Sequence, residues 1–171
     1  MIRLWSWNRL TLKNSEPSSP ERAYLYALRI LAARDYTVAR LQEKLLGRGF
    51  ADTDVETALE RMVSEGWLDD RRFAERFAES ALASCRFYGP RLRQEMRRRG
   101  VPPEIVSEVL GRVLMECDEA GEVRAIVERR FSGFSFSTAS DREKRRTVGF
   151  LQRRGFSLSS IMRALRATEQ Y

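Results

Sequence analysis

The residues of this chain that could do chemistry are carboxylates, thiols and arginines, because the sequence contains no histidine. Without histidine, most zinc sites, Ser-His-Asp triads and imidazole general bases are excluded. Cys85 and Cys117 lack metal-site spacing, and we expect buried free thiols in a reducing compartment. Asp69 and Asp70 are adjacent, but neighbouring side chains diverge at a helix start, so we interpret them as helix caps. We therefore predict no enzyme activity, no metal and no cofactor.

Positive charge is concentrated in the later parts of the chain. The 171 residues carry a net charge of +7, which favours an anionic partner. Residues 22–67 hold seven basic and seven acidic side chains, whereas residues 86–112 hold seven arginines against three glutamates. Residues 141–171 hold eight basic against three acidic side chains. The first part is therefore neutral, and the other two are basic.

The sequence gives no sign of a membrane or secreted protein. No apolar run approaches the ~20 residues that span a bilayer. Residues 1–19 form a leader without the continuous hydrophobic segment of a signal peptide. We expect a cytoplasmic protein without membrane contact.

A joint between two helices occupies residues 66–74, with the sequence GWLDDRRFA. Gly66 is placed to end one helix in a left-handed conformation. Asp69 or Asp70 then caps the next helix by accepting hydrogen bonds from its first amide groups, and the other adds charge that favours a helix N-terminus. We expect Trp67 and Leu68, between these signals, to be buried. Apolar residues at three- and four-residue spacing follow, which is typical of a helix that continues to about Phe87.

Other helix starts are marked by capping residues along the chain. At the third helix we expect Asp52 or Thr53 as the cap, with Thr53 and Glu56 forming a capping box. Ser140 and Glu143 predict a second capping box. The remaining predicted N-caps are Ser19, Thr37, Asp118 and Ser157.

The chain repeats one pattern three times. When Gly49, Gly100 and Gly155 are aligned, an arginine precedes each and Phe, Val or Phe follows. Leucine or methionine stands four residues before each glycine, valine or isoleucine six after, and leucine ten after. Five matched positions in three segments indicate tandem repeats.

We therefore predict an all-α fold of three tandem three-helix repeats that resemble helix-turn-helix units. They occupy residues 20–67, 68–116 and 117–171 after the leader. Each unit is small, so we expect neighbours to pack together in an elongated, curved body. Five aromatic residues could stack on bases, but their positions favour core packing; they are Tyr24, Tyr26, Tyr36, Phe87 and Tyr88.

Outward-facing arginines are the candidate binding residues. If Leu92 and Met96 face inward, Arg93 and Arg97 fall together on the outer flank of their helix. Two neighbouring units are basic on such faces, which favours contact with DNA phosphates or acidic protein patches over a merely solvated surface. The candidates are Arg91, Arg93, Arg97, Arg98, Arg145, Arg146, Arg153, Arg163 and Arg166.

Three segments resemble the RecX family of regulators of the recombinase RecA. They are residues 66–74, residues 89–101 (GPRLRQEMRRRGV) and residues 150–157 (FLQRRGFS). The resemblance implies three helical repeats that bind the RecA–DNA filament in its groove and inhibit filament extension. It also implies a role in homologous recombination, DNA repair and the SOS response.

The alternative is a stand-alone DNA-binding module that uses helix-turn-helix units and phosphate contacts. No recognition helix carries the Asn, Gln and Arg pattern of base readout. The sequence also lacks an evident dimerisation segment, so we expect a monomer. The expected partners are the RecA filament and DNA, either single-stranded or filament-bound.

Overall fold

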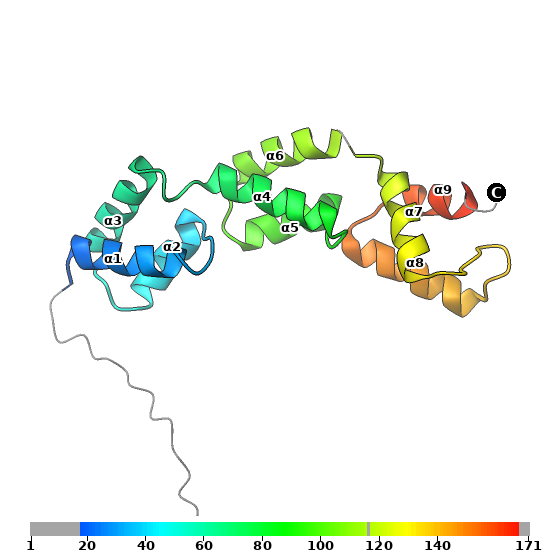
Figure 1. The fold of residues 1–171 in the computed structure, drawn as a ribbon, viewed down its shortest axis with the longest axis horizontal. Helices are drawn as coiled ribbons and strands as arrows, with labels where there is room; N and C mark the ends of the chain where they lie inside the picture. The colour runs from blue at the N-terminus through cyan, green and yellow to red at the C-terminus, as the bar shows by residue number, and fades with distance from the viewer. Residues whose placement is uncertain (1–17, 116, 168–171) are drawn as a thin grey trace, which may run out of the picture.

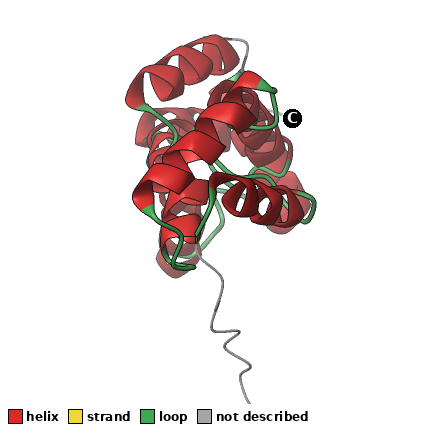
Figure 2. Ribbon diagram, turned by 90° about the vertical axis from the view of Figure 1, so that its left-hand side faces the viewer, coloured by secondary structure: helices red, strands yellow, loops and turns green. Residues whose placement is uncertain are grey.

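The computed structural model describes residues 18–115 and 117–167, which form helices and loops without a strand (Figures 1 and 2). The described helices are α1 (Pro20–Leu31), α2 (Val38–Leu46), α3 (Asp52–Ser64), α4 (Asp70–Ala83), α5 (Gly89–Arg98), α6 (Pro103–Met115), α7 (Glu119–Arg130), α8 (Asp141–Arg154) and α9 (Leu158–Ala167). The all-α prediction is confirmed. Most of the predicted leader, residues 1–17, lies outside the described residues.

These helices group into three units that follow one another along an elongated body (Figure 1). In each unit the first and third helices make the broadest contact: α1 with α3, α4 with α6, and α7 with α9. The extensive helix–helix contacts of the described residues all fall within a unit. The tandem three-helix repeat is thus confirmed, and the units meet through narrow junctions between their loops and helix ends.

Each unit has a hydrophobic core built on the positions that the repeat register predicts to be inward, and the third core also includes Cys85 and Tyr88 from the second unit. The residues four before, six after and ten after the aligned glycines are all buried. They are Leu45, Met96 and Leu151, then Val55, Val106 and Ile161, then Leu59, Leu110 and Leu165. Burial of each such aliphatic side chain contributes roughly 1.5–3 kcal/mol to folding. The five aromatic residues lie in or against these cores.

Most predicted helix caps are present, and one is wrong. Ser140 and Glu143 form a complete capping box at α8. Neither Asp52 nor Thr53 is the cap, because the N-cap of α3 is Ala51, two residues before Thr53, and the predicted box of Thr53 and Glu56 does not form. The Ala51 amide instead donates to the Ser18 hydroxyl at 3.0 Å. Caps are made as predicted by Ser19, Thr37, Asp69, Asp118 and Ser157.

Two predictions at the joint and beyond it need correction. Of the two apolar residues at the joint, Leu68 packs into the first core, and Trp67 is left 56% exposed. Its indole N–H donates to Glu65 at 3.1 Å. Helix α4 ends at Ala83 rather than near Phe87, because Cys85 adopts a left-handed φ of 48°.

Candidate functional site

The first and second units are joined by hydrogen bonds from the start of α2. The Thr37 hydroxyl donates to the Arg99 carbonyl oxygen at 2.6 Å, and the Arg40 guanidinium donates to the Arg98 carbonyl oxygen. The Val38 amide donates to the Asp70 carboxylate at 2.9 Å. Burial raises the pKa of Asp70, and this hydrogen bond opposes the rise. Asp69 therefore caps α4, whereas Asp70 accepts a hydrogen bond from the preceding unit.

The second and third units are joined at the same register positions. Tyr88 is the N-cap of α5, as Thr37 is of α2, and its amide donates to the Arg154 carbonyl oxygen at 2.7 Å. Arg154 precedes its turn glycine just as Arg99 does. The Tyr88 ring stacks on Phe156 with centroids 4.7 Å apart, and burial is the main cause that raises the pKa of Tyr88 to about 12. Both junctions are thus formed by residues at equivalent positions of the repeat.

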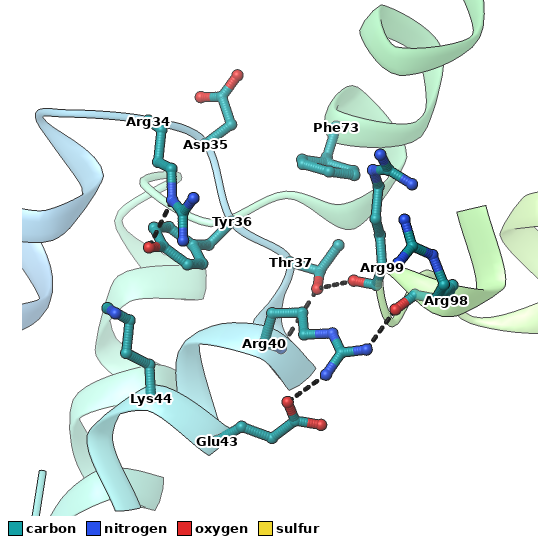
Figure 3. A pocket seen from close by; sticks show the side chains of 10 residues that line it. All are labelled: Arg34, Asp35, Tyr36, Thr37, Arg40, Glu43, Lys44, Phe73, Arg98 and Arg99. Atoms are coloured by element: carbon teal, nitrogen blue, oxygen red, sulfur yellow. Dashed lines mark hydrogen bonds and ion pairs between the residues drawn. The ribbon is translucent and has the colours of Figure 1, made fainter. Parts of the chain in front are cut away.

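A groove of about 580 Å³ lies at the junction of the first and second units (Figure 3). Its walls include five basic side chains: Arg34, Arg40, Lys44, Arg98 and Arg99. Figure 3 shows Arg34 and Lys44 on one side and the two arginines of the second unit on the other. The groove therefore draws positive charge from two units.

The acidic residues in this groove are already engaged. Glu43 pairs with Arg40, and Asp35 pairs with Arg76 at 2.9 Å. Arg34 donates from Nε to the Tyr36 hydroxyl at 2.6 Å and lies 4.6 Å from the centre of that ring. Its described partner is thus a neutral group.

A buried glutamate orients the arginines of α5. Glu95 is 3% exposed and forms ion pairs with Arg91 at 2.9 Å, Arg98 at 3.0 Å and Arg99 at 2.6 Å. The hydrogen bond from Arg99 is the main reason why the pKa of Glu95 lies below its usual value, and Arg98 adds to it. Arg99 also lies 4.2 Å from the centre of the Phe77 ring. The helix therefore presents arginines in fixed directions.

We expect Glu95→Gln to flatten the acid dependence of stability. A carboxyl group with a lowered pKa in the folded chain stabilises it above the unfolded pKa, about 4.3, and this contribution is lost as pH falls further. The variant should be about 1–2 kcal/mol less stable at neutral pH, since charge-assisted hydrogen bonds are lost. Hydrogen exchange of the α5 amides at pH 7 and at pH 3 measures the stability difference between wild type and variant at each pH. A difference that does not narrow at pH 3 contradicts the assignment.

The other predicted arginines are exposed but lie in separate places. Arg93 and Arg97 project from α5, and Arg93 donates to the Ser107 hydroxyl at 3.2 Å. The remaining candidates belong to the third unit, further along the body (Figure 1): exposed Arg145, Arg146 and Arg153 on α8, and exposed Arg163 and Arg166 on α9. Only Arg91 and Arg98 are brought together, around Glu95.

Sequence reasoning missed Arg34, Arg40, Lys44 and Arg99 as groove residues. Three of these residues lie in the first unit, whose net charge is zero. A charge count for a segment does not show which of its side chains lie close together in the fold. The only available signal was the capping residue Thr37, which fixes the start of α2 and the directions of its side chains.

Two features are absent from the part of the chain that the structure describes. No helix in the described part of the chain combines the length and apolar character needed to cross a bilayer. Among residues 18–115 and 117–167, cysteine and carboxylate side chains form no cluster that could hold a metal ion.

Comparison with known families identifies relatives for each unit. Models of the first, second and third three-helix domains of RecX match residues 23–62, 69–110 and 120–165. Regulatory protein RecX of Trichlorobacter lovleyi is 45% identical over 148 residues, which are 86% of this chain and 96% of that protein. Regulatory protein RecX of Thermus thermophilus is 38% identical over 149 residues, which are 86% of this chain and 93% of that protein.

Solved structures share the fold at low sequence identity. The crystal structure of RecX from Lactobacillus salivarius has a TM-score of 0.73 at 15% identity, over 89% of this chain and 97% of that one. A second crystal structure of a regulatory protein RecX has a TM-score of 0.67 at 19% identity, over 86% and 71% of the two chains.

Proposed function

The chain belongs to the RecX family, and from that premise we propose that it inhibits RecA by binding the RecA–DNA filament. RecX proteins are regulators and not enzymes. In this proposal the elongated body lies in the helical groove of the filament and limits filament extension. It acts as a cytoplasmic monomer.

The observation that carries the proposal is a set of basic side chains without internal neutralisation. Within the described residues, no acidic side chain forms an ion pair with Arg97, Arg145, Arg146 or Arg153, and all four are exposed. Such side chains attract phosphates and acidic protein surfaces. A filament of RecA on DNA offers phosphates along its length, and a body of three basic or neutral units in a row suits an extended partner.

Titration against the single-strand-DNA-dependent ATPase of RecA tests this function. We expect inhibition when the protein is present well below the RecA concentration, because blocking the growth of a filament affects many protomers at once. Inhibition that appears only when the protein coats the DNA contradicts the proposal. It would favour the alternative, a DNA-binding module that competes for phosphates without any dependence on RecA.

A further inference from the structure

We propose that the groove between the first and second units binds the sugar–phosphate backbone of a single strand of nucleic acid. The proposal rests on the proposed function for its biological setting, where the strand is the DNA of the filament. It concerns a largely different surface, because Arg98 is the one predicted outward arginine that lines the groove and three of the groove's basic residues lie in the neutral first unit. They are Arg34, Arg40 and Lys44.

The first step of the argument is charge. The groove has five basic side chains and two acidic ones, and both acids are held by arginines. Within the described residues, neither Arg34 nor Lys44 forms an ion pair with a carboxylate. An anion that enters the groove therefore meets positive potential from these two side chains, which no carboxylate of the described residues pairs with.

The second step is pre-organisation of the opposite wall. Arg98 and Arg99 are tethered to the buried Glu95, so little further side-chain entropy is lost when they bind a ligand. Arg98 remains 68% exposed at its side chain. A guanidinium group has five N–H donors, and those not used by the glutamate can donate to phosphate oxygens.

The third step is the shape of the groove and its lining. The groove holds about 580 Å³ and is lined by basic side chains from two units, which suits a short stretch of one phosphate backbone. The ring of Tyr36 is covered by Arg34, and Phe73 stacks on Phe77 with centroids 6.3 Å apart. With these rings engaged, the groove favours backbone contacts over base stacking. Binding should therefore be independent of sequence.

Two single substitutions that change the net charge equally test the site. Lys44 lies in the last turn of α2 and lines the groove, whereas Arg29 lies in the last turn of α1 outside it. We expect Lys44→Glu to weaken binding of a fluorescein-labelled oligothymidylate about tenfold at low salt, with a shallower salt dependence. Arg29→Glu should change it about twofold or less. Fluorescence anisotropy with the full chain measures both.

Equal weakening by the two variants would overturn the proposal, because it would indicate only a long-range effect of net charge. Unchanged binding in Lys44→Glu would overturn it as well. The same variants in the RecA ATPase assay separate this proposal from the proposed function. If Lys44→Glu loses inhibition but keeps oligothymidylate binding, the groove contacts protein and the nucleic-acid assignment is wrong. If wild-type protein binds the oligonucleotide through Lys44 but never inhibits RecA, only the proposed function fails.

Discussion

Replacing Gly155 with alanine is expected to destabilise the junction of the second and third units by about 3 kcal/mol. Gly155 has a φ of 102°, where an alanine costs roughly 1–2 kcal/mol. The added Cβ would also overlap the carbonyl oxygen of Tyr88 and lie 2.7 Å from Cβ of Arg91. Relief of this overlap requires Tyr88 to move. The hydrogen bond from its amide to the Arg154 carbonyl oxygen and its stack on Phe156 would then be strained.

Gly49→Ala is the matched control for this effect. Gly49 occupies the same register position in the first unit with a φ of 96°, but an added Cβ meets nothing within 4 Å. Gly49→Ala should cost only the conformational penalty, roughly 1–2 kcal/mol. Because the units have separate cores, unfolding need not be two-state, so hydrogen exchange is the better measurement. Gly155→Ala should lower protection of amides in α5 and α8; equal losses in both variants contradict a junction defect.

The local features of this fold were predictable because they depend on neighbours in sequence. The capping box at Ser140, the left-handed Gly66 and the inward positions of each unit follow from spacing alone. The exposure of Trp67 could not be predicted in this way, because two adjacent apolar residues after a glycine give no periodicity that shows which one faces the core. Asp70 was interpreted only within its own helix, although its carboxylate serves α2 as well.

The candidate site depends on contacts that sequence spacing does not reveal. Thr37 and Arg99 are 62 residues apart, and only the junction of two units brings them together. In the sequence, Glu95 is an acidic residue among arginines, and its position three residues after the buried Leu92 places it near the inward face of the helix. Its burial still required the three-dimensional arrangement, because charged residues are almost never buried unless they are paired.

Reversing the charge of four outward arginines together is expected to weaken filament binding about 100-fold at moderate salt, since several phosphate contacts of this kind carry most non-specific affinity. The variant is Arg93→Glu, Arg97→Glu, Arg145→Glu and Arg146→Glu. Stability should change little, because no described acidic side chain pairs with these arginines and all four are exposed. Co-sedimentation with RecA filaments measures the affinity, and circular dichroism reports the helix content.

Two half variants show which unit carries the effect. Arg93→Glu with Arg97→Glu alters only α5, and Arg145→Glu with Arg146→Glu alters only α8. If both faces contact one extended partner, each pair should lower the affinity and the two free-energy changes should add, because the sites lie in different units. A full effect from one pair alone would place the contact on a single unit. Unchanged affinity of the four-site variant, with its helices intact, would show that these arginines are only a solvated surface.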